Sequence, residues 1–442
     1  MKDTFNQKNS SYYEEPSRRI PIMANVDVLV VGGGPAGVCA AVGAARAGAE
    51  TLLVEKNGCL GGMWISGLVL TLAGFNSWLK PYPRCAGGIV GEWLKRAAAI
   101  SSAEDGPSWT LSSEPEGMKL IADLLVEEAG VRCLLHTWFA SAIREGKNVL
   151  GALVENVEGR AGILARVTVD CTGNGDVLAR CGGSWEKAVE GQPMTTSFII
   201  GDVETDPGIS PTDPALIPIG PEPGLLEEPL LSRYASRRLE VACDRGAMLQ
   251  AYKHGKIPPF GGPWFGGLHK NTVWVNATRL FGDGCSASDL TRAEMEGRKS
   301  VFRFLEYFHK SLNGFRQAHL LQTGAQVGVR ESRRLKGRYS LSEEDVKHSA
   351  RFDDPIGLGC WPVDVHPPAG SGVHPLYVPL PFQIPYRCLV PADTGGLLAG
   401  GRCVSADREA LGSIRVSATC GVTGQAAGAA AAIAAAKRIP PA

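Results

Sequence analysis

The clearest pattern of apolar and polar positions lies near the N-terminus of the chain. A short, valine-rich apolar run at 26–31 is typical of a buried parallel strand, because such strands are covered on both faces. An alanine-rich segment at 36–47 predicts a helix of small side chains, and a second apolar run at 51–54 predicts another strand. The order of strand, helix and strand predicts a βαβ unit.

Three glycines join the first strand to the helix. Gly32, Gly34 and Gly37 form the pattern G-x-G-x-x-G, which permits a tight turn, close approach of backbone amides to a pyrophosphate, and close packing of helix on strand. The helix N-terminus adds partial positive charge for the same ligand. Glu55 ends the second strand, where an acid can accept hydrogen bonds from a ribose. We predict a nucleotide site here, with a close-packed βαβ unit that binds no ligand as the alternative.

The apolar runs that follow predict the rest of one sheet. Residues 118–128 have helical periodicity, and the run at 131–139 predicts the next strand. Runs at 149–154 and 163–173 predict an antiparallel meander, whose last strand returns to the sheet and ends at Asp170.

The pattern changes from about residue 184. A proline-rich stretch at 202–229 predicts a long ordered loop, and residues 261–282 alternate like strands around glycines. The clearest amphipathic helix covers 289–312, with Thr291 or Asp289 as its N-cap. We divide the chain into an N-terminal extension (1–22), the first part of a nucleotide-binding domain (23–183), an inserted α+β domain, here called the cap domain (184–385), and the C-terminal part of the nucleotide-binding domain (386–442).

Composition narrows the classes of function. The chain has 442 residues and a formal net charge of +0, which gives no basic footprint for nucleic acid. Its 12 cysteines lack C-x-x-C spacing, so we predict no metal site and no dithiol relay, and a reducing cytoplasm fits best. The N-terminus carries acids without an apolar core, and no uninterrupted apolar stretch reaches about 18 residues, so neither a signal peptide nor a membrane span is expected.

Three further segments carry a resemblance to a known family. They are DCTGNGD at 170–176, GVRESRR at 328–334 and GRCVSADREALGSIRVSATCGVTGQAAG at 401–428. With the βαβ unit they make the chain similar to FAD-dependent oxidoreductases of the glutathione-reductase-like flavoprotein fold, and more narrowly to a bacterial family marked by a G-V-R-E-S-R-R-type segment. The resemblance implies FAD as cofactor and an α/β fold, with a Rossmann-like FAD-binding domain, an antiparallel β-meander and an inserted α+β cap domain.

The resemblance also implies cofactor contacts beyond the βαβ unit. It places the backbone at 172–173 against the pyrophosphate with Asp176 nearby, an ordinary strand-to-helix turn being the alternative. Gly61 and Gly62 lie near the flavin edge or form a simple turn. The resemblance aims a helix that starts at 423–425 at the flavin pyrimidine, where the helix dipole stabilises negative charge. The full predicted set is Gly32, Gly34, Pro35, Ala36, Gly37, Glu55, Lys56, Gly61, Gly62, Met63, Phe139, Thr172, Gly173, Asp176, Gly401, Arg402, Thr423, Gly424 and Gln425.

Catalytic candidates come from the cap domain and from its return to the FAD domain. Within GVRESRR, we expect Arg330 to face the active site; the alternative is a solvated face in which the arginines pair with Glu331 and Glu343. His366 stands among prolines at the domain junction, where ligands prefer to bind, and is the candidate for proton transfer, a structural histidine being the alternative. The remaining candidates are Tyr386, Arg387 and His269.

These features predict an FAD enzyme that moves a hydride between flavin N5 and a small organic substrate beneath the cap. A flavin-dependent monooxygenase is the enzymatic alternative, and a non-catalytic FAD-binding subunit of a larger complex is the alternative from another class. The sequence has no second G-x-G-x-x-G unit, so a dedicated NAD(P)H domain is not expected. The expected partner is a small-molecule substrate, with neither nucleic acid nor membrane, and the sequence leaves room for a homo-oligomer.

Overall fold

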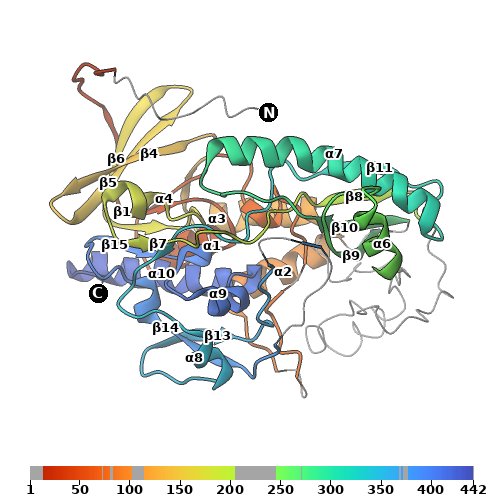
Figure 1. The fold of residues 1–442 in the computed structure, drawn as a ribbon. Coiled ribbons are helices and arrows are strands. Elements are labelled where there is room, and N and C mark those ends of the chain that lie inside the picture. Colours follow the sequence, from red (N-terminus) through yellow and green to blue (C-terminus); the bar gives the residue numbers. More distant parts are fainter. Residues whose placement is uncertain are drawn as a thin grey trace.

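The computed structural model describes residues 13–71, 73–79, 83–101, 114–204, 245–269, 271–367, 370–371 and 377–441. Most of the predicted proline-rich loop at 202–229 lies outside these residues. The described residues form a Rossmann-like α/β unit that carries a β-meander, and a second sheet covered by helices lies beside it (Figure 1). The predicted fold class is confirmed.

The nucleotide-binding sheet runs in the order β3–β2–β1–β6–β15, with all of these strands parallel. Alternate residues of β1 enter two different cores: Val28 and Val30 face one, and Leu29 and Val31 face the other. Burial on both faces explains why this strand is apolar throughout. The bounds are β1 (Ile22–Val31), β2 (Thr51–Val54), β3 (Arg132–Leu134), β6 (Gly159–Asp170) and β15 (Leu397–Ala399).

Strand β6 also belongs to the meander at the upper left of Figure 1. Its first half pairs antiparallel with β5 (Asn148–Asn156), which pairs with β4 (Trp138–Glu145), while its last residues pair with β15. The prediction of a single strand at 131–139 is wrong. That stretch contains β3 and the start of β4, because His136 adopts a left-handed backbone conformation (φ 50°) between them.

Two helices of small residues pack against each other beside the sheet: α1 (Pro35–Arg46) and α10 (Ser417–Lys437). A Cβ atom added at Gly424 would overlap the carbonyl oxygen of Ala36, and one added at Gly428 would overlap that of Ala40. The two backbones therefore touch, which explains the runs of glycine and alanine in both helices. Helix α10 begins at Ser417, several residues before the predicted start at 423–425.

Other helices complete this half of the molecule. Trp93 of α2 donates its indole N–H to the carbonyl oxygen of Met118 in α3 at 2.8 Å, which joins these two helices. No helix in the described ranges is both long and apolar enough to cross a bilayer. The bounds are α2 (Gly88–Ser101), α3 (Pro115–Glu128), α4 (Asp176–Cys181), α9 (Arg408–Ile414) and the short 3-10 helices η1 (Gly62–Trp64), η2 (Tyr386–Leu389) and η3 (Gly401–Cys403).

The cap is a four-stranded sheet in the order β11–β8–β10–β9, with the long helix α7 along it (Figure 1). Its own core contains Phe198, Phe260, Phe304 and Phe308, all fully buried. The N-cap of α7 is Ser286, and neither Thr291 nor Asp289, because its hydroxyl accepts the Asp289 N–H at 3.3 Å. The bounds are β8 (Phe198–Gly201), α6 (Arg245–Lys253), β9 (Phe260–His269), β10 (Thr272–Thr278), α7 (Ala287–Ser311) and β11 (His319–Thr323).

The chain after the cap sheet returns to the FAD side before residue 385. Leu341, Val346, Phe382 and Ile384 lie in the same core as α1 and α10, whereas the cap sheet has a core of its own. The domain limit at 385 stays a prediction, and the packing links this part of the chain to the FAD side. The elements here are β7 (Trp185–Glu186), β12 (Arg334–Leu335), α8 (Glu343–Lys347), β13 (Pro355–Gly359) and β14 (Phe382–Pro385), with β12 paired to β7 and β13 to β14.

Candidate active site

A cavity of about 720 Å³ extends from the carboxyl ends of the parallel strands to the cap sheet. Val31, Val54 and Cys171, at or just after the ends of β1, β2 and β6, line one part of it, and Trp264 of β9 and Asn276 of β10 line another. In open α/β sheets, ligands bind outside the carboxyl ends of the strands. The cavity is therefore where the fold itself predicts a ligand.

The glycine turn forms the wall beside the start of α1. Gly32 has a φ of 99°, which other residues rarely adopt, and a Cβ atom at Gly37 would overlap the carbonyl oxygen of Gly32. No side chain caps α1 at Gly34, so the first N–H groups of the helix remain available at the cavity. Gly37 itself supports the turn from behind and does not line the cavity.

Glu55 lies next to this turn, at the end of β2. Its side chain is buried, and its carboxylate accepts the N–H of Gly33 at 2.6 Å and that of Asn57 at 2.9 Å. The carboxylate thus fixes the glycine turn while also lining the cavity. This position suits an acid that accepts hydrogen bonds from a ribose.

The second turn, at 172–176, is held by a residue whose role the sequence did not reveal. Asp170 is fully buried and accepts the N–H groups of Val177 and Leu178, each at 3.0 Å, and the hydroxyl of Thr172 at 2.7 Å. An acid followed by Thr-Gly at a strand end was the available signal. Asp176, which was predicted to lie near the pyrophosphate, lines the cavity and forms an ion pair with Arg333.

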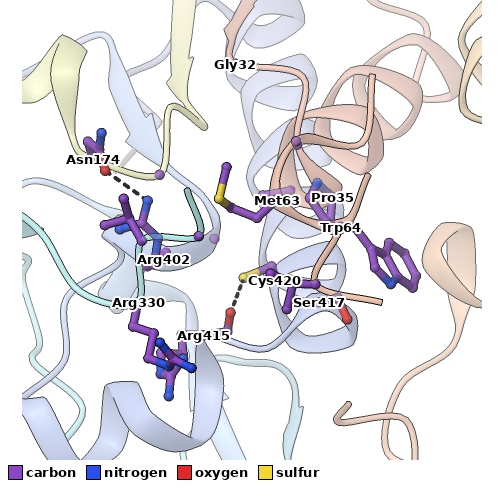
Figure 2. A pocket seen from close by; sticks show the side chains of 18 of the residues that line it. Gly32, Pro35, Met63, Trp64, Asn174, Arg330, Arg402, Arg415, Ser417 and Cys420 are labelled. Atoms are coloured by element: carbon purple, nitrogen blue, oxygen red, sulfur yellow. Dashed lines mark hydrogen bonds between the residues drawn. The ribbon is translucent and has the colours of Figure 1, made fainter. Parts of the chain in front are cut away.

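The GVRESRR segment fastens this second turn. Ser332 donates its hydroxyl to the carbonyl oxygen of Gly173 at 3.0 Å, and Arg333 Nε donates to that of Asn174 at 2.9 Å. Arg402 binds both the segment and the turn. Its Nη1 donates to Ser332 Oγ at 2.7 Å. Its Nη2 donates to Asn174 Oδ1 at 2.9 Å (Figure 2). The segment therefore packs against the predicted cofactor turn and is not a solvated face.

The start of α10 opens onto the cavity. Val416, Ser417 and Cys420 line it, and no side chain caps the helix. The three predicted residues lie farther along the helix: Thr423 Oγ1 accepts the Gly401 N–H at 2.9 Å, and Gln425 Oε1 accepts the Ile89 N–H at 2.9 Å. Thr423, Gly424 and Gln425 thus serve packing within the FAD domain, and the helix N-terminus is formed by residues that the sequence analysis did not select.

His366 and Asp364 form a buried pair at the cap end of the cavity. His366 Nε2 lies 3.2 Å from Asp364 Oδ1, and the imidazole ring meets Trp264 edge-on. Arg415 holds the same aspartate, since its Nη2 donates to the Asp364 carbonyl oxygen at 2.7 Å and to Oδ2 at 3.2 Å. Arg330 Nη1 donates to the carbonyl oxygen of Pro193 at 2.6 Å. Arg330 and Arg415 reach into the same part of the cavity (Figure 2).

Burial and neighbouring charges shift the pKa values of His366, Arg330 and Asp364. Burial lowers the pKa of His366 to about 3, and the charge of Arg330 acts in the same direction. Burial and the guanidinium groups of Arg279 and Arg415 lower the pKa of Arg330 to about 9, which leaves it charged at neutral pH. Burial alone would raise the pKa of Asp364, but its contacts with His366 and Arg415 outweigh burial and hold it well below its ordinary range. At neutral pH the cluster holds a neutral imidazole, one carboxylate and several cations.

Two of the catalytic candidates, Arg387 and Tyr386, lie away from the cavity. The Arg387 side chain is 46% exposed, and its Nε is paired with Asp354 Oδ2 at 3.0 Å. The Tyr386 hydroxyl donates to the carbonyl oxygen of Pro441, and His269 is the last residue of β9. Neither Tyr386 nor Arg387 lines the cavity, so their positions do not support a catalytic role. The side chain of His269 lies outside what the structure describes, so its role stays a prediction. His366 and Arg330 do line the cavity.

The predicted cofactor residues divide in the same way. Those that line the cavity are Gly32, Gly34, Pro35, Ala36, Glu55, Lys56, Gly62, Met63, Phe139, Thr172, Gly173, Asp176, Gly401 and Arg402. Sequence reasoning missed Asn174, Arg415 and Asp364, although Asp364 stands two residues before His366 and was detectable as D-x-H.

These features fit FAD. Two helix N-termini without side-chain caps face one continuous cavity, and such ends favour anionic groups. Glycines allow close approach at the first turn, and a buried carboxylate stands at the position suited to a ribose. The residues present would hold a dinucleotide along the strand ends, with its redox-active end toward the cap.

Parts of the chain are similar to curated proteins. Among curated proteins, digeranylgeranylglycerophospholipid reductase of Methanoculleus marisnigri is 29% identical over 196 residues, which are 42% of this chain and 48% of that protein. Thiamine thiazole synthase of Aeropyrum pernix is 30% identical over 166 residues, 35% of this chain and 57% of that protein. The chain thus spans about half the length of the curated relatives it matches.

Solved structures also resemble the chain. A geranylgeranyl bacteriochlorophyll reductase-like protein of Thermoplasma acidophilum has 13% identity and a TM-score of 0.47, with 94% of this chain and 80% of that chain covered. A flavin-dependent brominase has 14% identity and a TM-score of 0.45, with 93% and 80% covered. The resemblance to the glutathione-reductase-like fold, and the narrower one to a bacterial family with a G-V-R-E-S-R-R-type segment, stay predictions. The model of the FAD dependent oxidoreductase family matches residues 27–442. The chain therefore belongs to the FAD dependent oxidoreductase family, and it is an enzyme with FAD as its cofactor.

Proposed function

We propose that the protein transfers a hydride between bound FAD and a small organic substrate held between the FAD side and the cap. The observation that carries the proposal is the continuous cavity, which joins the glycine turn at one end to the His366–Asp364 pair at the other. When bound, FAD supplies the hydride chemistry at its flavin ring. The protein supplies orientation, charge and a route for the accompanying proton.

His366 is the residue that we assign to the proton. A neutral imidazole has one N–H donor and one acceptor nitrogen, and Nε2 faces the Asp364 carboxylate at 3.2 Å. The contact with Asp364 favours the tautomer with the hydrogen on Nε2, which leaves Nδ1 as the acceptor. His366 therefore accepts a proton from substrate at Nδ1 during oxidation, or returns it during reduction.

Arg330 and the start of α10 stabilise negative charge beside the reacting atoms. Arg330 is fixed by Pro193, and the α10 N-terminus carries uncapped N–H groups at Ser417. Fixed donors of this kind favour negative charge that develops during hydride transfer, because they need no reorganisation. Arg330 also orients the substrate.

A screen of metabolites for anaerobic bleaching of the bound flavin tests the proposal. We expect at least one small organic compound to bleach the purified, FAD-loaded protein, and its oxidised product to appear in the same amount. If reduction requires NAD(P)H and a hydroxylated product forms with O₂ uptake, the protein is a monooxygenase and the proposal is wrong. The remaining outcome is a flavin that is not reduced by any organic donor, by NAD(P)H or by photoreduction without dithionite. That result would instead indicate a non-catalytic FAD-binding subunit.

A further inference from the structure

We propose that the substrate carries a carboxylate on a flat, apolar body, and that Arg330 and Arg415 bind this carboxylate. The inference rests on the proposed function, because the cap end of the cavity is a substrate site only if FAD binds at the other end. It goes further by naming the class of substrate and the residues that select it.

Among the described residues, the charge at the cap end is not balanced. Arg330 and Arg415 both line the cavity there, and Asp364 is paired with Arg415 and lies close enough to Arg330 for each to affect the other's pKa. With His366 neutral, positive charge exceeds negative charge in this cluster of described residues. Uncompensated charge away from bulk water is unfavourable, so the cluster gains free energy when an anion joins it.

Neighbouring carboxylates are committed elsewhere. Glu294, which lines the cavity from α7, is paired with Arg298 of the same helix at 3.3 Å. Glu331 is buried and pairs with Arg334 at 2.8 Å and with Arg408 at 3.2 Å. Neither is paired with Arg330 or Arg415, so an anionic group of the ligand would complete the charge of this cluster of described residues.

Both arginines keep donors for a ligand. Arg330 uses Nη1 for Pro193 and Thr195, and its Nε and Nη2 have no partner among the described residues. Arg415 uses Nη2 for Asp364, and its Nε is buried without a hydrogen-bond partner in the part of the chain that the structure describes. A guanidinium group offers a planar fork of N–H donors that matches a carboxylate.

The same donors suit a carboxylate better than a phosphate. A phosphate monoester presents a third terminal oxygen, which needs a further donor nearby. The Thr195 hydroxyl does not supply it, because it donates to the carbonyl oxygen of Thr278 at 3.1 Å and accepts from Arg330. A planar carboxylate needs no third donor and matches the planar fork of each guanidinium group.

The walls beside the arginines are aromatic. Trp78, Trp264, Trp274 and Trp361 line the cavity, and Trp78 meets Trp361 edge-on with ring centroids 5.2 Å apart. The Trp274 indole N–H is bound to the carbonyl oxygen of Leu68 at 2.6 Å, which fixes its ring. Flat aromatic walls favour a flat apolar ligand through stacking and edge contacts. The walls and the arginines together describe an aromatic or conjugated carboxylic acid.

A carboxylate ligand also bears on the protonation of His366. The charge of Arg330 is one cause of the low pKa of His366, alongside burial, and Arg279 acts in the same direction while Asp364 opposes it. A carboxylate bound to Arg330 and Arg415 would offset that positive charge and raise the pKa of His366. The substrate would thus make the imidazole a better proton acceptor when it is needed.

Binding of a matched pair of probes to the FAD-loaded protein tests the proposal. The probes are 2-naphthoate and its neutral counterpart 2-naphthamide, with 2-naphthyl phosphate as a third arm, measured by calorimetry and by the change in the visible flavin spectrum. We expect naphthoate to bind at least about tenfold more tightly than naphthamide, because charge-assisted hydrogen bonds are stronger than neutral ones. In Arg330→Gln we expect naphthoate affinity to fall about 10- to 100-fold, while naphthamide changes little.

The control is Arg338→Gln, which removes an exposed arginine near the same segment and should leave both affinities unchanged. Arg330→Lys provides a second variant if Arg330→Gln does not fold, and it should retain part of the preference for naphthoate. Equal binding of naphthoate and naphthamide, unchanged naphthoate affinity in Arg330→Gln, or tighter binding of naphthyl phosphate would each overturn the inference. Bleaching of the flavin by neutral substrates alone would also overturn the inference, while the proposed function stands. Naphthoate binding without any substrate that reduces the flavin would overturn the proposed function and leave the carboxylate site standing.

Discussion

The two ends of the cavity are built in different ways. At the FAD end the contacts come from backbone, namely the turns at 32–37 and 172–176 and the uncapped start of α10. At the cap end they come from side chains that are distant in sequence, such as Arg330 and Arg415. The lining of the FAD end thus comes from short segments of the sequence, whereas the lining of the cap end depends on the tertiary fold. The following predictions test this contrast.

The largest effect is expected at the FAD end of the cavity. In Gly37→Ala the new Cβ would overlap the carbonyl oxygen of Gly32, so the turn and α1 cannot keep their packing. We expect loss of bound FAD and a destabilisation of about 1–3 kcal/mol. The measurements are flavin absorbance per protein after gel filtration and the urea midpoint. Gly191→Ala is the control, because no atom lies within 4 Å of its added Cβ. Full FAD content in Gly37→Ala would show that backbone contact is not what this end requires.

At the cap end of the cavity, His366→Asn should slow flavin reduction without affecting cofactor binding. We expect the protein to retain stoichiometric FAD while anaerobic flavin reduction by the substrate slows about 10²–10⁴-fold. His348→Asn is the matched control, since that histidine is exposed on the surface. A wild-type rate in His366→Asn would move proton transfer to another group.

Glu55→Ala probes the acid beside the glycine turn at the FAD end. Loss of a charge-assisted hydrogen bond should weaken FAD binding about 10- to 100-fold, equivalent to about 1.5–3 kcal/mol. Affinity is measured by titration of the apoprotein with FAD, with Glu50→Ala as the control because Glu50 is exposed and paired with Arg132. Unchanged affinity in a folded Glu55→Ala protein would mean that the acid serves only the glycine turn.

The pH dependence of stability sharpens the description of the cap end. The pKa of His366 is about 3 in the folded protein and about 6.5 when unfolded, so the unfolded state binds more protons between these values. Stability therefore rises with pH across this window; it is complete above pH 6.5 and is lost as the pH falls. Relative to His366→Asn, the protein should lose about 2 kcal/mol of unfolding free energy between pH 7 and pH 5. Urea titrations at saturating FAD measure this, and parallel curves for the two proteins would contradict a buried neutral imidazole beside Arg330, Arg279 and Asp364.

The smallest effect is expected outside the cavity. Arg387→Ala removes an exposed ion pair with Asp354, so stability should change little. FAD content and the reduction rate should equal those of the wild type. A tenfold slower reduction of the flavin would support Arg387 as a substrate-binding residue. The cap end of the site would then extend to the domain junction.

The contrast also explains how far the sequence could predict the molecule. The βαβ unit was predictable because valine-rich strands, glycine spacing and Glu55 all lie within thirty residues. The start of α10 was not, because Val416 stands at the N-cap and provides no side-chain signal. The ion pair of Arg387 was not predictable, because its partner Asp354 lies 33 residues away and sequence spacing cannot show that their side chains meet. Asp170 was read as the end of a strand, and only the fold reveals that it anchors the next helix.

The contact between α1 and α10 has a consequence for the conformational entropy of the site. Its facing residues, such as Gly424, Gly428, Ala36 and Ala40, have no rotamers to lose when the two helices dock. The cofactor end is therefore assembled at almost no cost in side-chain freedom. An ordered arginine loses up to about 2 kcal/mol in this way, and at the cap end that cost arises during folding, because Arg330 and Arg415 are already tethered to the protein. A ligand that reaches them meets side chains that no longer have to be immobilised.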